Sequence, residues 1–238
     1  LDLRKRTAEV LVREFESGNL GLYAGPYPAT FSGRDIYFNA TRTPGDNTSP
    51  EDWTRAEING RRDAWTMCEA WRRELPEFED AYFMMSGPVA GARESRRIIG
   101  DYVLKDSDVA EGKRKADVVL IGAWRMDLHP PDKPGYHDIP WIPPYDIPFG
   151  TLLPVAFDNL LVAGRCHSAT STALSSSRVT ATAMGMGQAA GTAAALAIAS
   201  GQSPRDVDVT AIQDAIIAAD GILEPPDADD ATVGNPDW

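Results

Sequence analysis

Apolar and polar positions form the most informative pattern of this chain between residues 158 and 197. A short apolar run at residues 160–163 ends at Gly164, and a loop rich in serine and threonine follows it. Such a run is typical of a central parallel strand that stops at a crevice, where open α/β sheets bind their ligands. The serines at positions 175–177 are N-cap candidates for a helix that begins near Arg178 or Val179. The stretch therefore predicts a buried strand, a polar loop and a helix in that order.

The predicted helix consists mainly of alanine and glycine. Gly185, Gly187 and Gly191 fall in its interior, where each glycine costs about 1 kcal/mol relative to alanine. Three such glycines predict that another backbone or a ligand passes close to the helix. The N-terminus of the helix would offer free N–H groups and a partial positive charge to an electron-rich ligand in the crevice.

Hydrophobic periodicity and capping signals predict further helices. Apolar residues recur at helical spacing over residues 1–17, and Ser49, followed by a proline and two acids, marks the start of a helix that runs to about Arg73. Ser107 opens a short helix, and a final helix is expected over residues 207–219.

Strand signals are weaker than the helix signals. The alternating residues 35–39 predict a strand, which we expect to form a small sheet with residues 81–85. Residues 95–104 are expected to form a strand or a strand pair. The proline-rich run at 130–154 predicts an extended loop that is anchored by its aromatic residues and isoleucines. The acidic tail from Glu224 onwards predicts a segment that is mobile or laid over a partner.

Composition and charge narrow the class of protein. The 238 residues are 43% hydrophobic, enough for a sizeable core in one or two domains, and carry a formal net charge of -12. That charge argues against nucleic acid or an anionic membrane as a partner. The one long apolar stretch, residues 181–199, is mostly alanine and glycine, so we expect no membrane span. Without a signal peptide pattern, we expect a cytoplasmic protein.

The cysteines and histidines predict no metal site. Cys68 and Cys166 are too few for a disulfide framework or a thiolate site, and the histidines have no ligand spacing. Cys68 falls in a predicted helix and is expected to be buried. Cys166 follows Gly164 and Arg165 and is positioned to face a ligand at the strand end.

Three segments carry a resemblance to a known family. NLLVAGRCHSAT at residues 159–170, SSRVTATAMGMGQAAGTAAALA at 176–197 and GARESRRIIGDYVL at 91–104 resemble the C-terminal half of FAD-dependent oxidoreductases. These belong to the glutathione-reductase-like superfamily, and the likeness is greatest to relatives of fumarate reductase and succinate dehydrogenase flavoproteins. FNATRTPGD at 38–46, TRAEINGRRDA at 54–64, MDLH at 126–129 and YDIPFGTLLP at 145–154 extend the resemblance.

The resemblance implies an α/β protein with FAD as its cofactor. It implies a substrate-side α+β region at residues 1–90, the C-terminal part of an FAD/NAD(P)-binding fold at 91–204, and a helix with an acidic tail at 205–238. Flavoproteins of this kind bind the FAD pyrophosphate through an N-terminal strand–GxGxxG–helix unit. No such segment follows a strand near residue 1. We therefore expect a missing N-terminal segment or a partner chain to supply the dinucleotide-binding half.

The resemblance also assigns residues to the cofactor. The strand-end residues are expected near the ribityl chain or pyrophosphate, and the helix start is expected to face the pyrimidine edge of the flavin, at N1 and O2. Together these cofactor-binding candidates are Gly164, Arg165, Cys166, Ser177, Arg178, Val179 and Thr180.

Catalytic candidates are His167, His129 and Arg97. A histidine can take the proton that accompanies hydride transfer to flavin N5. On a strand, Arg93 and Arg97 would share one face, and at least one arginine of this cluster is expected to pair with Glu94 or Asp101. The cluster is either an ion-pair latch between domains or a contact to cofactor or anionic substrate.

Two other functions fit the same residues. The chain could be a non-catalytic assembly subunit that keeps the flavoprotein fold, or a domain that binds another ligand at the strand end. The substrate is expected to be a small molecule, and the sequence leaves a carboxylate, a sugar and a cyclic alcohol open.

Overall fold

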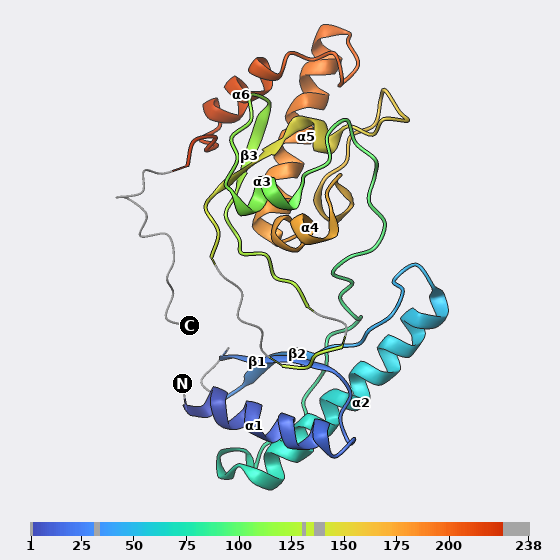
Figure 1. Cartoon of the computed structure of the whole chain (residues 1–238), viewed down its shortest axis with the longest axis vertical. Coiled ribbons are helices and arrows are strands. Elements are labelled where there is room, and N and C mark those ends of the chain that lie inside the picture. The colour runs from blue at the N-terminus through green and yellow to red at the C-terminus, as the bar shows by residue number, and fades with distance from the viewer. Residues whose placement is uncertain (1, 31–33, 130–131, 136–140, 226–238) are drawn as a thin grey trace. The chain divides into compact units, whose positions relative to one another are not determined.

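The computed structural model describes residues 2–30, 34–129, 132–135 and 141–225, which divide into two compact units (Figure 1). The first contains the described parts of residues 1–92 and 129–138, and the second those of residues 93–128 and 139–238. The sequence-based regions divide the chain after residues 90 and 204 instead. In the structure His129 falls in the first unit, and the described residues beyond 204 belong to the second. The acidic tail beyond residue 225 lies outside the described residues.

The first unit consists of α1 (Asp2–Glu16), β1 (Tyr23–Thr30), β2 (Ile36–Thr41) and α2 (Pro50–Glu74). Ser49 caps α2 as predicted, because its side chain accepts a hydrogen bond of 3.2 Å from Asp52 N. Val10, Leu11, Met67 and Trp71 are buried between the two helices, and Trp71 Nε1 donates to Thr7 O over 3.1 Å. These contacts hold α1 on α2.

The sheet of the first unit differs from the prediction. β2 pairs antiparallel with β1, whereas residues 81–85 form no strand. β1 contains Gly25, Pro26 and Pro28, which are residues that strands usually avoid. They are tolerated because β1 is an edge strand in a two-stranded sheet and its register shifts between Tyr23 and Tyr27. The prediction for 81–85 was therefore wrong.

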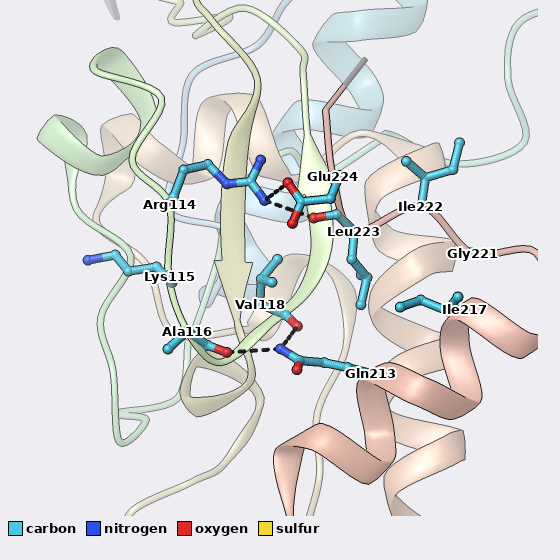
Figure 2. A pocket seen from close by; sticks show the side chains of 10 residues that line it. All are labelled: Arg114, Lys115, Ala116, Val118, Gln213, Ile217, Gly221, Ile222, Leu223 and Glu224. Atoms are coloured by element: carbon cyan, nitrogen blue, oxygen red, sulfur yellow. Dashed lines mark hydrogen bonds and ion pairs between the residues drawn. The ribbon is translucent and has the colours of Figure 1, made fainter. Parts of the chain in front are cut away.

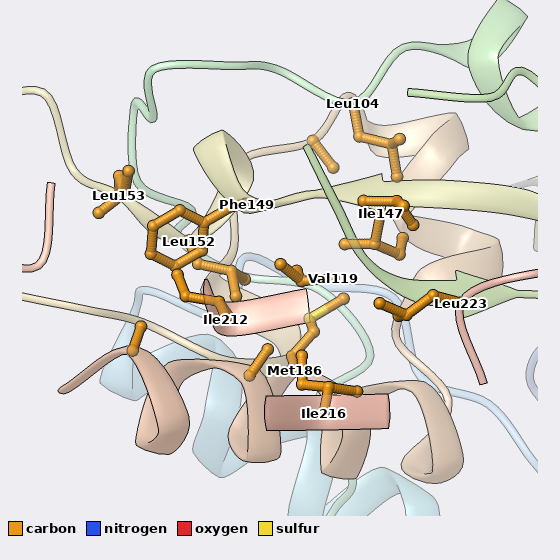
Figure 3. Close-up of a cluster of buried hydrophobic side chains, with 14 of the residues drawn as sticks. Leu104, Val119, Ile147, Phe149, Leu152, Leu153, Met186, Ile212, Ile216 and Leu223 are labelled. Atoms are coloured by element: carbon orange, nitrogen blue, oxygen red, sulfur yellow. The ribbon is translucent and has the colours of Figure 1, made fainter. Parts of the chain in front are cut away.

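The second unit contains α3 (Asp106–Ala110), β3 (Val118–Gly122), β4 (Tyr145–Pro148), α4 (Ser171–Ser177), α5 (Thr180–Ser200) and α6 (Val209–Ala218). β3 and β4 pair antiparallel, with Gly122 opposite Tyr145. Figure 3 shows the core, in which Val119 and Ile147 of this sheet meet Met186 of α5 and Ile216 of α6. The two helices thus cover a two-stranded sheet.

Several strand predictions for the second unit were wrong. β3 was not predicted, and β4 lies inside the proline-rich run expected to be a loop. Residues 95–104 form only isolated bridges, from Gly100 to Pro154 and from Leu104 to Ala169. Their backbone groups bond to turns instead, as Tyr102 N does to Gly150 O over 3.1 Å. A continuous partner strand is absent from the described residues around them.

Residues 160–163 are not the buried parallel strand that the pattern predicted. Ala163 has extended backbone angles (φ -143°, ψ 159°), but Leu160 is 42% exposed and no strand of the described chain lies beside the segment. Val162 N donates a hydrogen bond to Leu152 O over 3.0 Å. The apolar run gives the segment an extended backbone. A β-strand also needs a neighbouring strand to hydrogen-bond with, and the described chain supplies none here.

The long helix α5 begins within two residues of the predicted position. Val179 is its N-cap, and the serines at 175–177 are buried in α4 rather than capping α5, so the predicted hydroxyl cap was wrong. A Cβ at Gly185 would lie 2.4 Å from Leu120 Cδ1, whereas nothing lies within 4 Å of one at Gly187 or Gly191. Within the described chain, close approach explains only the first of the three glycines.

Hydropathy gives no membrane-crossing helix. Among the helices that the structure describes, none combines the length and apolar character needed to span a bilayer.

Candidate cofactor-binding site

A sharp turn follows the extended segment at residues 160–163. Gly164 adopts φ +75°, a conformation that favours glycine, and starts the 3-10 turn Gly164–Cys166. Arg165 and Cys166 are exposed on this turn. The turn packs on α5, since a Cβ at Gly164 would lie 3.6 Å from the Ala183 methyl group. The structure thus brings three predicted cofactor residues against the first turns of α5.

The N-terminus of α5 has no side-chain cap. Val179 cannot accept a hydrogen bond through its side chain, and the first turn holds no acidic residue. The backbone N–H groups of Thr180 and Ala181, both on exposed residues, find no acceptor in the part of the chain that the structure describes. The positive end of a 21-residue helix therefore lies uncompensated beside the Gly164 turn.

Arg178 lies between α4 and α5, and its side chain is only 10% exposed. Its Nη2 donates to Asp127 O over 2.7 Å and lies 3.8 Å from the Asp127 carboxylate, which also binds Arg93 Nη1 at 2.6 Å. Burial lowers the pKa of Arg178 and Arg93 adds to this effect, while Asp127 and Glu94 oppose it. The guanidinium is thus engaged by the loop after β3, and the backbone of Arg178 leads into the open end of α5.

The arginine cluster upstream of Gly100 is paired internally. Arg97 forms an ion pair with Glu94, which also accepts a 2.8 Å hydrogen bond from Ser171. Burial raises the pKa of Glu94, but the hydrogen bonds from Arg97 and Ser171 outweigh it and the net shift is downwards. The expected pairing with Glu94 is confirmed, although it occurs in a loop and not on a strand. Asp101 pairs with Arg205 instead.

His167 is fully buried, and both of its ring nitrogens have partners. Nδ1 lies 2.8 Å from Gly164 O, and Nε2 lies 3.1 Å from Ser177 Oγ. Burial lowers the pKa of His167, the Gly164 carbonyl opposes this, and Arg97 lowers the pKa further. A neutral ring carries one hydrogen, which must sit on Nδ1 to meet the carbonyl. Nε2 is then an acceptor for the Ser177 hydroxyl, which also lies within donating distance of Ala173 O, at 3.2 Å. His167 therefore fastens the Gly164 turn to the end of α4.

The other predicted residues are divided between the units. Arg97, His167 and the predicted cofactor residues lie in the second unit, whereas His129 is half-buried in the first. Cys68 is half-buried on α2. Among the described His, Cys, Asp and Glu side chains, no group of three is arranged to hold a metal ion.

Comparison with known protein families shows which family this chain belongs to. A family model described as FAD dependent oxidoreductase matches residues 5–216. The chain belongs to this family. Its cofactor is FAD. No curated protein and no solved structure matches the chain significantly.

The residues of this FAD-dependent oxidoreductase fit the cofactor. An isoalloxazine ring presents an electron-rich pyrimidine edge, and the uncapped end of α5 presents N–H donors with no competing acid. Arg165 adds an exposed guanidinium on the adjoining turn. The donor set matches a ligand with an electron-rich ring and phosphate groups.

Sequence reasoning missed Asp127, which joins the two arginines Arg93 and Arg178. An acid just after the apolar residues 118–122 was the available signal, but its partners are 34 and 51 residues away in the sequence. Ser176 was expected to be a cap and instead hydrogen-bonds Tyr145 OH at 2.7 Å.

A separate pocket of about 860 Å³ lies between the residues before β3 and the end of α6. Figure 2 shows that Arg114 donates to Glu224 and to Leu223 O, and that Gln213 donates to the carbonyls of Ala116 and Val118. Lys115 Nζ donates instead to Tyr102 OH, over 2.9 Å. None of the predicted site residues lines it. Arg114 and Gln213 are therefore occupied in holding α6 and the following residues on β3.

Proposed function

We propose that this chain supplies the flavin-ring side of the FAD site, and part of the substrate pocket, in an FAD-dependent oxidoreductase whose dinucleotide-binding half comes from another segment or subunit. The observation that carries the proposal is the uncapped N-terminus of α5 beside the Gly164–Cys166 turn. Membership of the family supports the cofactor.

The first turn of α5 orients the ring. Bound FAD supplies the redox chemistry, in which a hydride moves between a small organic substrate and flavin N5. The N–H groups of Thr180 and Ala181 donate to the pyrimidine edge, and the positive end of α5 stabilises negative charge there. Val179 leaves these donors open because it has no side-chain acceptor. Ser177 and Arg178 position this backbone from behind through His167 and Asp127.

The Gly164–Cys166 turn faces the ribityl and phosphate side of the cofactor. Gly164 permits the backbone to turn at φ +75°, and Arg165 places a guanidinium where it can bind a phosphate oxygen. Cys166 lies on the same exposed turn. These residues bind and orient, and we assign no covalent step to the thiol.

The catalytic candidates take different roles in this proposal. Because both His167 nitrogens are occupied inside the protein, the geometry favours a positioning role for it, by holding the Gly164 turn in place. His129, in the substrate-side unit, is then our candidate for the group that takes the proton released from the substrate. Arg97, which is partly exposed beside Glu94, is our candidate for a substrate contact.

Two surfaces support a separate dinucleotide-binding half. The extended residues 160–163 have no strand partner in the described chain. On α5, the apolar side chains of Met184 and Ile198 are 71% and 83% exposed. Gly187 and Gly191 lie on exposed positions of α5, where a neighbouring backbone has room to approach closely. A parallel sheet with its helix is the kind of unit that covers such a strand and helix.

The test is to co-express this chain with the coding segment that precedes it, purify the complex and record the flavin absorbance spectrum. We expect the pair to retain FAD and the chain alone to retain much less. A pair that forms but holds no FAD would overturn the proposal. A pair that holds FAD, yet whose flavin no organic substrate reduces, would favour the assembly subunit over the enzyme.

A further inference from the structure

Two tryptophans and an arginine form an exposed cluster after β3. Trp124 and Trp141 are 42% and 45% exposed, and their rings meet edge to face with centroids 6.4 Å apart and planes at 77°. The Arg125 guanidinium carbon lies 5.9 Å from the Trp124 ring centroid and 5.5 Å from that of Trp141. Large aromatic side chains half open to solvent beside a cation are typical of a ligand-binding surface.

Arg125 differs from several other arginines of the second unit. Arg93, Arg97, Arg178 and Arg205 each lie within ion-pair distance of a carboxylate. For Arg125 no carboxylate partner occurs among the residues that the structure describes, although the chain carries a net charge of -12. Its planar guanidinium is held by ring contacts and is suited to bind a carboxylate through two parallel hydrogen bonds.

The cluster is built on a rigid base. The Trp124 carbonyl accepts a hydrogen bond from Ser176 of α4, and Ser176 Oγ lies 2.7 Å from the hydroxyl of the fully buried Tyr145. Two residues beyond Arg125, Asp127 binds Arg178 at the entrance to α5. Both anchors come from elements that form the candidate cofactor site. The aromatic cluster is thus tied to the same loop and helix that we assign to the flavin ring.

We infer that Trp124, Arg125 and Trp141 form a recognition site for a ring compound that bears a carboxylate. The guanidinium binds the carboxylate, and the exposed indole surfaces pack on the ring of the ligand. Sugar acids and aromatic acids share this chemistry. That the compound is the substrate rests on the proposed function, whereas its binding does not.

The inference is tested with the full chain and four probes, by calorimetry and saturation-transfer NMR. Glucuronate and benzoate are compared with glucose and benzyl alcohol, which keep each ring and lack the charge. We expect one acid to bind about tenfold or more tightly than its neutral counterpart, because a hydrogen bond to a charged group is lost in the latter. If glucuronate is the acid that binds, the ligand is a sugar acid, and if benzoate binds, it is an aromatic acid. If neither acid binds more tightly than its neutral counterpart, the inference is wrong.

Variants separate this site from the rest of the surface. Arg125→Gln should weaken binding of the acid about tenfold or more, and Trp124→Ala should weaken it as well. Trp124→Phe, which keeps a smaller ring, should give an intermediate loss and serves if the alanine variant does not fold. Trp65 is a matched control, because it is exposed and meets Phe83 edge to face in the first unit, and no guanidinium of the described residues lies over its ring. Trp65→Phe should change nothing.

FAD retention by the co-expressed pair is measured on the same preparations. FAD retention without binding of an acid would overturn this inference and leave the proposed function standing. Binding of an acid without FAD retention would support this inference and overturn the proposed function. Unchanged binding in Arg125→Gln would also overturn the inference, because the guanidinium is the group assigned to the carboxylate.

Discussion

The Ser177 hydroxyl lies 3.1 Å from His167 Nε2, at a position where both residues are fully buried. This contact joins the end of α4 to the turn that begins at Gly164, because the other nitrogen of His167 meets the Gly164 carbonyl. Since only Arg178 and Val179 separate α4 from α5, the same contact fixes where the open N-terminus of α5 lies relative to the turn. A buried neutral imidazole therefore sets the geometry of the candidate cofactor site.

The first prediction concerns the pH dependence of stability. The folded-state pKa of His167 lies below its ordinary value of 6.5, mainly because of burial. Its contribution to stability is therefore fully present above about pH 6.5 and is lost as the pH falls, because the unfolded chain then binds a proton that the folded chain excludes. The loss approaches about 1.4 kcal/mol per pH unit for one proton. Urea unfolding between about pH 8 and pH 5.5 measures it.

His167→Gln should unfold more easily at pH 8 and lose part of this pH dependence. The carboxylates titrate in both proteins, so the difference between their two curves of unfolding free energy against pH isolates His167. Parallel curves for the two proteins would contradict the buried neutral histidine.

Most helices could be predicted because their signals are local. Ser49 before Pro50 and the 3.6-residue periodicity locate α2, and similar patterns locate α1 and α6. The exception is α4, whose serine-rich sequence reads as a loop. It is helical because Ala173 and Leu174 are buried and its serines bond to His167 and Trp124, contacts that only the tertiary structure creates.

The strands and the site depended on partners that the sequence does not reveal. Residues 160–163 read as a strand yet have no neighbour in the described chain, while β1 pairs despite its prolines. The ion pair of Arg97 with Glu94 was predictable, because the residues are three positions apart. Asp127 was not, because the loop after β3 reaches Arg178 only through the fold.

A second prediction places an acid at the open end of α5. Val179→Asp gives the first turn a side-chain acceptor and a negative charge, so it should stabilise the chain by about 1 kcal/mol. The same carboxylate would occupy the donors assigned to the flavin, and FAD affinity of the co-expressed pair should fall. Thermal unfolding and FAD titration measure the two effects. Val179→Ala is the control, since it adds no acceptor and should leave FAD binding close to that of the original protein. A rise in stability with unchanged FAD affinity would show that these donors do not bind the cofactor.

A third prediction compares two glycines of the same helix. Gly191→Ala adds a methyl group into open space and should stabilise the chain alone by about 0.5–1 kcal/mol. Gly185→Ala should gain less or lose stability, because its methyl group would lie 2.4 Å from a Leu120 methyl group that must move. Urea unfolding of both variants gives the comparison. In the complex with the dinucleotide-binding half, Gly191→Ala should weaken association if a backbone packs at that position. Equal gains for both variants in the isolated chain would contradict the packing of Leu120 on Gly185.

A fourth prediction concerns Tyr145, whose hydroxyl meets Ser176 Oγ at 2.7 Å in a fully buried position. Burial raises the pKa of Tyr145 to about 12. Because the folded value exceeds the ordinary value of 10.0, stability is retained below about pH 10 and falls towards pH 12, by up to about 2–3 kcal/mol. Tyr145→Phe should lose about 1 kcal/mol near neutral pH and lack this alkaline loss.

The same substitution tests the support of the aromatic cluster. Ser176 can keep its bond to the Trp124 carbonyl in Tyr145→Phe, but it loses the partner that fixes its own position. Binding of the acid probe should therefore weaken less than in Arg125→Gln, since the guanidinium stays in place. Calorimetry of both variants decides the order. Suppose that Tyr145→Phe loses as much affinity for the acid probe as Arg125→Gln does. The conformation of the Trp124 loop would then depend on the buried hydroxyl, and the carboxylate contact would not be assigned to Arg125 alone.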